Sequence, residues 1–306
     1  MTRIVCIGEC MVELRAVGAD TFARSYAGDV YNTAVYLKRS LPDAQVQFLT
    51  AIGDDAMSSA MRRMWHAQEI DDALAFPVPG GSAGLYLIET DALGERSFQY
   101  WRRDSAARHW LALLVENGES LLHGADTVYF SGITLAILNP DERAAAIDLL
   151  RRVRRHVGHI AFDPNVRLRL WQSPQVAAQT IRAAMSVCDI ALPSAVDLAW
   201  LLGIGEPMRQ IDLLIEMGVS EVALTLGAAG CAIADGTMRK RLPTLSVERV
   251  IDTSGAGDAF NGAYLANRLQ GRSPDEAAQA AIQIASRAVT HAGAIVPASV
   301  SHPAMS

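Results

Sequence analysis

Residues 250–260 read V-I-D-T-S-G-A-G-D-A-F, and this stretch is the most informative part of the chain. A short apolar run gives way to Gly255 and Gly257, and a helical pattern then continues to Leu269. Glycines at a helix start let backbone N–H groups approach a ligand closely, and a helix N-terminus favours negative charge. The stretch therefore predicts a phosphate-binding turn, although the chain has no Gly-Lys-Ser/Thr ending of a P-loop.

Asp258 stands at the end of this turn, and two roles are open for it. A carboxylate there can accept the proton of a hydroxyl group as that hydroxyl attacks a phosphoryl group held on the N–H groups. The alternative is structural, because aspartate is a preferred helix cap and the glycines would then only form a tight turn. The stretch by itself leaves both interpretations open.

Outward from this stretch, strand-like runs alternate with helical patterns along most of the chain. We expect strands at residues 4–7, 46–52, 127–130, 159–162, 190–192, 222–226 and 231–234, and helices at residues 32–39, 55–68, 140–155, 174–187 and 209–217. Asn32 would cap the first helix, and Asn139 would cap the third, with Pro140 in its first turn. The alternation predicts an α/β fold with parallel strands joined by crossover helices.

One region breaks this alternation. Residues 84–90 and 97–101 are strand-like and flank a turn at residues 91–96, which predicts a β-hairpin. Residues 11–15 could add a further strand. Since the chain shows no internal repeat and no linker rich in Ser, Gly or Pro, we expect one α/β domain over residues 1–306. A small β-sheet would come from two separate segments, at about residues 11–30 and 83–103.

Composition narrows the class of function. Half of the 306 residues are hydrophobic, and 27 Lys and Arg against 33 Asp and Glu leave a net charge of −6. An acidic chain is a poor binder of nucleic acids and of anionic membranes. The basic run at residues 151–155 ends a predicted helix, where cations complement the helix dipole. We therefore expect no nucleic-acid partner and no membrane partner.

The cysteines and the N-terminal residues indicate a reducing compartment. The chain has four cysteines and no C-x-x-C pair, which predicts reduced, buried thiols at Cys6, Cys10, Cys188 and Cys231. The N-terminal apolar stretch is too short for a signal peptide, and charged residues follow it too closely. No apolar run reaches the length of a membrane span. A cytoplasmic enzyme with a small-molecule substrate is the resulting expectation.

Residues 252–258, D-T-S-G-A-G-D, resemble the D-T-x-G-A-G-D signature of the ribokinase-like carbohydrate kinases, the phosphofructokinase-B family. Further segments agree in chain order: residues 27–34 resemble the family's N-terminal Gly/Asn signature, residues 52–55 its I/V-G-x-D segment, and residues 225–231 its T-x-G-x-x-G loop. The resemblance implies a Rossmann-like, mostly parallel sheet with helices on both faces. It also implies a small β-sheet lid over the sugar, which agrees with the hairpin expected above.

Within that family, the chain resembles the branch that phosphorylates the sugar acid 2-keto-3-deoxygluconate. The segments that carry this resemblance are residues 8–14, 84–86, 94–102, 131–133 and 163–171. They imply ATP-dependent phosphorylation of the terminal hydroxyl, with Mg²⁺ accompanying ATP. Two alternatives remain: a kinase for a neutral sugar such as fructose, and a catalytically silent sugar sensor. The intact Gly-Ala-Gly-Asp argues against the sensor, which would need no base.

The resemblance also assigns roles to individual residues. Asp258 would be the base, and the anion hole would be formed by Gly255, Ala256 and Gly257. The substrate would contact Gly28, Asn32, Tyr86, Tyr100, Arg102, Ile133 and Arg167. Arginine suits a carboxylate because its planar fork makes two charge-assisted hydrogen bonds. The alternatives are a solvated surface position for Arg102 and the helix cap for Asn32. Because side chains alternate along a strand, only one of Tyr100 and Trp101 would face the substrate.

On the nucleotide side, the resemblance implies Ser194, Thr225, Gly227, Gly230, Gly257 and Ile282. Ile282 equally fits the core of a helix. The family's Asn-x-x-Glu motif for magnesium matches residues 194–197 here, S-A-V-D, so no direct metal ligand is assigned. Asp197 would act at most through water. A lid hairpin has free edges and apolar side chains such as Leu85, Leu87 and Phe98, and pairing two lids would cover them. We therefore predict a homodimer.

Overall fold

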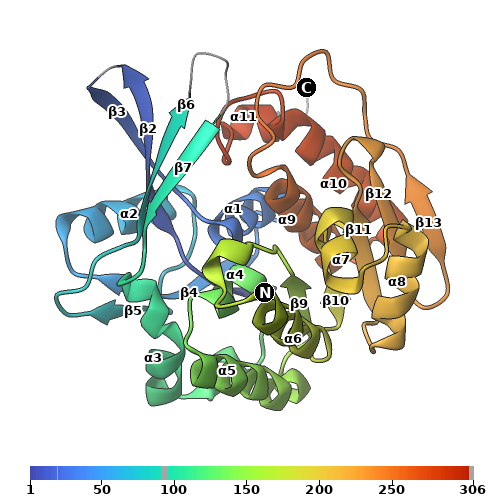
Figure 1. Cartoon of the computed structure of the whole chain (residues 1–306), viewed down its shortest axis with the longest axis horizontal. Helices are drawn as coiled ribbons and strands as arrows, with labels where there is room; N and C mark the ends of the chain where they lie inside the picture. The colour runs from blue at the N-terminus through green and yellow to red at the C-terminus, as the bar shows by residue number, and fades with distance from the viewer. Residues whose placement is uncertain (19, 91–95, 303–306) are drawn as a thin grey trace.

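The computed structural model describes residues 1–18, 20–90 and 96–302. Within them lie two sheets, one of nine strands in the order β13-β12-β11-β10-β9-β8-β1-β4-β5 and one of four in the order β3-β2-β6-β7. The four-stranded sheet, called the second sheet below, stands at the upper left of Figure 1, apart from the large sheet and its helices. The expectation of an α/β fold with a small additional β-sheet is confirmed.

The large sheet is parallel except at one edge. Its parallel strands are β1 (Arg3–Ile7), β4 (Gln45–Gly53), β5 (Ala75–Val78), β8 (Thr127–Ser131), β9 (His159–Asp163), β10 (Ile190–Ala191) and β11 (Glu221–Thr225). The antiparallel edge consists of β12 (Cys231–Ala234) and β13 (Arg239–Leu242). Only the short turn η5 (Gly227–Ala229) joins β11 to β12. Such a connection is too short for a parallel crossover, so the expected alternation stops there.

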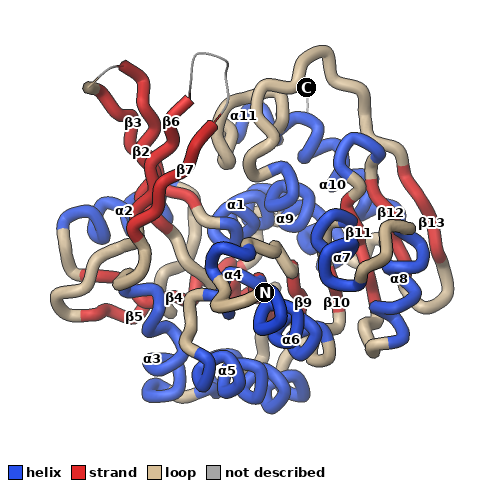
Figure 2. Tube along the Cα trace, viewed as in Figure 1, coloured by secondary structure: helices blue, strands red, loops and turns tan. Residues whose placement is uncertain are grey.

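Helices cover both faces of the large sheet, as Figure 2 shows. They are α1 (Asp29–Ser40), α2 (Ala56–Ala67), α3 (Trp110–Asn117), α4 (Gly132–Ala136), α5 (Pro140–Val153), α6 (Pro174–Met185), α7 (Ala195–Leu202), α8 (Pro207–Glu216), α9 (Ala256–Leu269), α10 (Pro274–Ala288) and α11 (Ala298–Ser301). Side chains of a strand alternate between faces. Accordingly, Val5 and Ile7 of β1 pack in one apolar core, while Ile4 and Cys6 pack in the other.

The start of the first helix corrects one expectation. The helix was expected at residues 32–39 with Asn32 as its cap, but α1 begins at Asp29 and Gly28 occupies the N-cap position. Asn32 is buried inside the helix, where its side chain is directed to Asp258 instead. The cap at Asn139 is confirmed, since its side chain and that of Glu142 bond reciprocally to the backbone of the first turn of α5.

The second sheet combines β2 (Met11–Gly18), β3 (Thr21–Ala27), β6 (Leu85–Thr90) and β7 (Arg96–Trp101). The expected hairpin is present, with β6 and β7 antiparallel and Tyr86 opposite Tyr100. Residues 91–95 of the predicted turn lie outside the described residues. β3 falls within the expected lid segment at about residues 11–30, although no separate strand was predicted there; it is mostly exposed and lies at the edge of the sheet beside β2.

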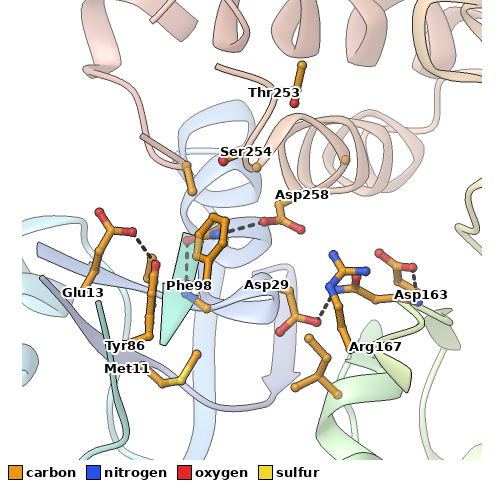
Figure 3. Close-up of a pocket in the computed structure, with 18 of the residues that line it drawn as sticks. Met11, Glu13, Asp29, Tyr86, Phe98, Asp163, Arg167, Thr253, Ser254 and Asp258 are labelled. Carbon is orange, nitrogen blue, oxygen red and sulfur yellow. Dashed lines mark hydrogen bonds between the residues drawn. The ribbon is translucent and has the colours of Figure 1, made fainter. Parts of the chain in front are cut away.

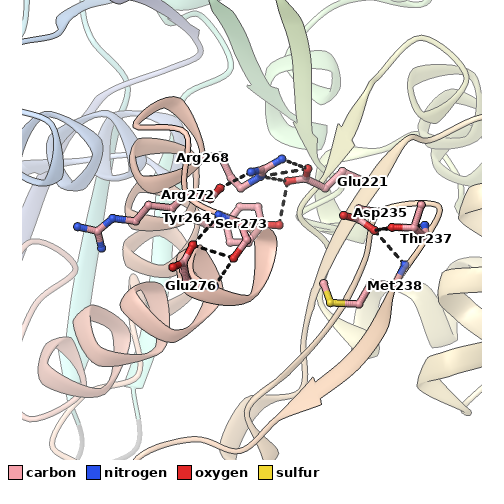
Figure 4. Close-up of polar contacts among 9 residues, drawn as sticks. All are labelled: Glu221, Asp235, Thr237, Met238, Tyr264, Arg268, Arg272, Ser273 and Glu276. Atoms are coloured by element: carbon pink, nitrogen blue, oxygen red, sulfur yellow. Dashed lines mark hydrogen bonds and ion pairs between the residues drawn. The ribbon is translucent and has the colours of Figure 1, made fainter.

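A polar junction anchors α9 on the large sheet (Figure 4). The carboxylate of Glu221, at the start of β11, accepts a hydrogen bond from the Tyr264 hydroxyl at 2.8 Å. It also forms an ion pair with Arg268 at 2.8 Å. Because Tyr264 and Arg268 both lie on α9, the junction fixes the helix whose first turn carries the predicted phosphate-binding stretch.

The cysteine prediction is confirmed: all four thiols are buried and free. Burial raises the pKa of the Cys6, Cys188 and Cys231 thiols to about 12, so these groups stay protonated at neutral pH. No helix in the part of the chain that the structure describes is long and apolar enough to cross a membrane.

Candidate active site

A cavity of about 580 Å³ lies between the second sheet and the carboxyl ends of the large sheet's strands. Figure 3 shows part of its lining. Asp163 and Thr225 are the last residues of β9 and β11, while Glu13 and Tyr86 belong to the second sheet. In open α/β sheets, ligands bind at the carboxyl ends of the strands. The cavity is therefore the candidate active site.

Asp258 faces this cavity from the first turn of α9. The N-cap of that helix is Gly255, which adopts the left-handed conformation with φ 72°, and Asp258 makes no capping hydrogen bond. The alternative interpretation of Asp258 as a helix cap is therefore wrong. Its carboxylate instead accepts a hydrogen bond from the Asn32 amide at 2.8 Å.

The surroundings of Asp258 make it a stronger base than an ordinary carboxylate. Desolvation, followed by the negative charge of Asp29, raises its pKa to about 7, against smaller opposing effects of Asn32 and Arg167. General bases work best when their pKa lies near the working pH. Asp258 is thus suited to take up a hydroxyl proton near neutral pH.

A network of carboxylates and amides forms the floor of the cavity. Asn165 donates from its side chain to Asp29 at 2.7 Å and from its backbone to Asp163 at 2.9 Å. Asn261 on α9 donates to the other oxygen of Asp163 at 2.8 Å. Burial, followed by the charges of Asp197, Asp258 and Asp29, raises the pKa of Asp163 well above its usual value. The predicted site did not include Asp29, Asp163, Asn165 or Asn261; the signal for Asp163 and Asn165 is their place at the end of a buried strand.

Arg102 lines the cavity but is already paired. Its guanidinium forms an ion pair with Glu9, and the two side chains are only 10% and 1% exposed. The other Glu9 oxygen accepts a hydrogen bond from the Ser105 hydroxyl at 2.6 Å. The alternative of a solvated surface position for Arg102 is therefore wrong. A contact with the substrate carboxylate stays a prediction, one that Arg102 would have to make while bound to Glu9.

Two further arginines reach the cavity from the loop after β9. Arg167 precedes the short turn η4 (Leu168–Leu170) and Arg169 lies within it, and both line the cavity. Burial raises the pKa of both Asp258 and Asp197, and the positive charge of Arg167 opposes part of that rise. Figure 3 shows Arg167 beside Asp29 and Asp163. Arg167 was among the predicted substrate residues, whereas Arg169 was not.

Aromatic rings of the second sheet form one wall of the cavity. Tyr86 and Tyr100 stack with their ring centroids 5.5 Å apart, and Tyr86 donates its hydroxyl proton to Glu13. Trp101 does not line the cavity and is 55% exposed, which confirms that only one of the neighbours Tyr100 and Trp101 faces it. Phe98 also lines the cavity and is 39% exposed, so it remains an apolar side chain that a second lid could cover.

The remaining predicted residues divide into two groups. The cavity is lined by Gly28, Ile133, Ser194, Thr225, Gly255 and Gly257. Gly28 must be a glycine, because a Cβ there would lie 2.1 Å from the carbonyl oxygen of Glu9. Gly227 begins η5, Gly230 follows it and Ala256 begins α9, and none of the three belongs to the lining formed by the described residues. Ile282 is 6% exposed in an apolar core. Ile282 therefore has the core position that was its alternative, and nucleotide contacts by Gly227 and Gly230 stay predictions.

Residues 1–300 match the family described as pfkB family carbohydrate kinase. The chain belongs to this family. One relative is the protein named 2-dehydro-3-deoxygluconokinase from Escherichia coli K12. It is 38% identical to this chain, and the match covers 96% of this chain and 97% of the relative. The protein of that name from Dickeya dadantii is 39% identical, with 96% of each chain covered. A fructokinase from Vibrio alginolyticus is 26% identical, with 87% and 84% covered.

Solved structures of other proteins share this ribokinase-like fold. A PfkB protein from Polaromonas superposes with a TM-score of 0.86 at 24% identity, covering 98% of each chain. A putative ribokinase II from Escherichia coli, solved in complex with ATP and Mg²⁺, gives a TM-score of 0.84 at 22% identity, covering 96% of this chain and 95% of the other. The Rossmann-like sheet with helices and a separate small sheet is therefore a ribokinase-like α/β fold.

Proposed function

We propose that this pfkB kinase transfers the γ-phosphoryl group of ATP to the terminal C6 hydroxyl of 2-keto-3-deoxy-D-gluconate. The product would be 2-keto-3-deoxy-6-phosphogluconate, an intermediate of sugar-acid catabolism. The observation that carries the proposal is Asp258, a carboxylate with a pKa of about 7 in the first turn of α9, facing a cavity that also contains arginines. The full-length relatives named 2-dehydro-3-deoxygluconokinase support this substrate, because 2-dehydro-3-deoxygluconate is another name for 2-keto-3-deoxygluconate.

Asp258 would act as the general base. Its carboxylate would accept the proton of the substrate hydroxyl as the hydroxyl oxygen attacks phosphorus. The Asn32 side-chain amide, which donates a 2.8 Å hydrogen bond to that carboxylate, would hold the carboxylate in position. The first backbone N–H groups of α9 have no acceptor within the helix and lie at the positive end of its dipole. Gly255, Ala256 and Gly257 would therefore stabilise the negative charge of the phosphoryl group during transfer.

The acidic floor of the cavity fits a magnesium–nucleotide complex. Mg²⁺ is usually held by one or two carboxylates together with phosphate oxygens and water. Asp163 and Asp197 both line the cavity, and the charge of Asp197 raises the pKa of Asp163, a repulsion that a divalent cation would relieve. Bound Mg²⁺ would neutralise part of the negative charge on the phosphates of ATP. Ser194 and Thr225 would border the nucleotide beside these carboxylates.

The second sheet would bind the sugar and exclude water. Tyr86 and Tyr100 would contact hydroxyl groups, and Arg102 with Arg167 would face the acidic end of the substrate. A closed site protects ATP from hydrolysis in the absence of the acceptor. A neutral sugar such as fructose is the alternative substrate, since relatives named fructokinase are 26–27% identical. The cavity arginines favour the acid, because a neutral sugar has no carboxylate for them.

The decisive measurement is ADP release with 2-keto-3-deoxygluconate, gluconate, fructose and ribose, assayed side by side. We expect kcat/KM for the ketodeoxy acid to exceed that for the neutral sugars by about 100-fold or more, because a neutral sugar cannot make charge-assisted hydrogen bonds with the cavity arginines. Phosphorus NMR should place the phosphate on C6. Preference for fructose or ribose would contradict the sugar-acid proposal. Tight sugar binding with no turnover on any of the four would indicate a sensor.

We also propose that the protein is a homodimer formed through its second sheets. The face of that sheet turned away from the cavity leaves large apolar side chains in water, with Trp101 55% exposed and Phe22 46% exposed. The edge strands β3 and β7 have one unpaired side each in the sheet order. Pairing with a second copy would cover both features.

A further inference from the structure

An irregular segment near the C-terminus, residues 293–296, borders the candidate active site, and its first two residues, Gly293 and Ala294, line the cavity. The segment lies against the glycine turn at the start of α9. A Cβ on Gly255 would lie 2.5 Å from the carbonyl oxygen of Ala294 and 2.8 Å from its Cα. The backbone of Ala294 therefore packs directly on the N-cap residue of the helix that carries the proposed base.

The side chain of Tyr36 holds this segment from α1. Its hydroxyl donates a hydrogen bond to the carbonyl oxygen of Ala294 at 2.9 Å and accepts one from the backbone N–H of Val296 at 3.1 Å. Tyr36 is buried, and burial raises the pKa of its hydroxyl, which therefore keeps its proton for donation at neutral pH. A single hydroxyl thus satisfies two backbone groups of a segment that belongs to no helix or strand.

Other side chains fix the two ends of the segment. The backbone N–H of Gly293 donates to the Asp252 carboxylate at 2.7 Å. The guanidinium of Arg39 donates to the carbonyl oxygen of Val296, also at 2.7 Å. The Tyr36 hydroxyl acts between these anchors, on the same carbonyl oxygen that faces Gly255. Tyr36 therefore sets how closely the segment approaches the glycine turn.

The same face of α1 also holds the base. Asn32 lies one turn before Tyr36, and its amide donates to the Asp258 carboxylate at 2.8 Å. Residues four positions apart share one face of a helix. α1 and α9 pack closely, since a Cβ on Gly262 of α9 would lie 2.5 Å from the backbone oxygen of Thr33. α1 therefore supports the start of α9 at two points, the base through Asn32 and the glycine turn through Tyr36.

We propose that Tyr36 is a positioning residue, whose hydroxyl holds Ala294 against Gly255 and so keeps the N–H groups of the glycine turn directed at the phosphoryl group. The inference rests on the proposed function and extends it to a residue outside the cavity lining that the described residues form. Donors stabilise the charge of a transition state best when they are held in place before the reaction. Loss of the Tyr36 hydroxyl therefore lowers turnover more than it weakens substrate binding.

The test is Tyr36→Phe, which removes the hydroxyl and keeps the ring. We expect kcat to fall about 10- to 100-fold, the usual result of a small displacement at a reacting centre, while the KM for the sugar stays within about twofold of the wild type. Tyr31→Phe is the matched control, because it removes another buried hydroxyl of α1, one without a hydrogen-bond partner among the described residues. The control should keep the wild-type kcat.

Hydrogen–deuterium exchange provides a readout that needs no turnover. In Tyr36→Phe, peptides covering residues 252–260 and 290–297 should exchange faster than in the wild type, and in Tyr31→Phe they should not. A wild-type kcat in Tyr36→Phe, even with a lowered melting temperature, would overturn the positioning role, and so would unchanged exchange of both segments. A wild type that phosphorylates none of the tested sugars would contradict the proposed function, while the exchange data would still decide the role of Tyr36.

Discussion

Asp258 illustrates how position changes the chemistry of a common side chain. An aspartate in water is a weak base, but desolvation and the nearby charge of Asp29 raise the pKa of Asp258 to about 7. The Asn32 amide opposes part of this rise, and it also fixes the carboxylate in one orientation. Asp258 therefore combines a pKa near neutrality with a fixed orientation of its carboxylate.

Replacing Asp258 tests the base directly. In Asp258→Asn we expect turnover to fall about 10²- to 10⁴-fold, the usual contribution of a general base, while sugar binding persists. The pKa of Asp258 is raised on folding, so its ionised form destabilises the native state as the pH rises through about 7. Thermal unfolding at pH 8 should therefore show a melting temperature equal to or above that of the wild type. Near-normal ADP release would disprove the assignment.

The pH profile provides a second test at the scale of single residues. Since the base must be ionised, kcat/KM should decline as the pH falls below about 7, where Asp258 becomes protonated. Asp29→Asn removes a charge that raises this pKa, and its amide oxygen can still accept from Asn165. We expect the fall of kcat/KM on the acidic side of the pH profile to begin about one pH unit lower than in the wild type. A limb at the wild-type position would show that another group controls it, and Asp43→Asn on the exposed surface is the control.

At the scale of elements, the N-terminus of α9 depends on two glycines with different roles. Gly255 has a φ of 72°, and a Cβ there would lie 2.5 Å from the carbonyl oxygen of Ala294. Gly257 is helical, and a Cβ there would meet no atom within 4 Å. Gly257 also lines the cavity. The first glycine is thus required by the fold, and the second leaves space for a ligand.

The two alanine variants should separate these roles. Gly255→Ala should lose about 2 kcal/mol or more of unfolding free energy, through backbone strain and the contact with Ala294. Gly257→Ala should keep or gain up to about 1 kcal/mol, since alanine favours a helix. Its methyl group would nevertheless point into the cavity, so turnover should fall. Denaturant unfolding and ADP release measure both effects, and a stable, fully active Gly255→Ala would contradict the argument.

At the scale of the whole molecule, net charge and local charge have different consequences. The chain carries a net charge of −6, yet the proposed ligands are anions. Positive groups nevertheless face the cavity, namely its arginines and the N-terminus of α9, although carboxylates line it as well. Local placement therefore outweighs the overall balance, because charges further apart than about 10 Å are screened at ordinary ionic strength.

The proposed dimer is tested at the same scale. Trp101 is 55% exposed on the face of the second sheet away from the cavity. In Trp101→Lys we expect a shift from dimer to monomer in sedimentation velocity, because two like charges would meet near the two-fold axis. The exposed Val115→Lys on α3 is the control. A wild type that sediments as a monomer at micromolar concentration would contradict the dimer.

Much of the architecture follows from local sequence patterns. Alternating apolar runs predict the central strands, and turn signals predict the β6–β7 hairpin, because these features depend on neighbouring residues. The elements without a signal include the edge strands β5 and β13. β5 contains Pro77, and β13 reads R-K-R-L. Edge strands need less apolar sequence because only part of their surface is buried.

The glycine turn, its helix and the aspartate at its start are determined by the sequence itself, since each depends on residues that are adjacent in the chain. The partners of the charged groups are decided by the tertiary structure alone. Asn32 meets Asp258 across 226 positions, and Glu9 meets Arg102 across 93. No local pattern records such contacts, because the packing of distant elements brings these side chains together. That packing pairs Arg102 with Glu9 and decides which arginines line the cavity.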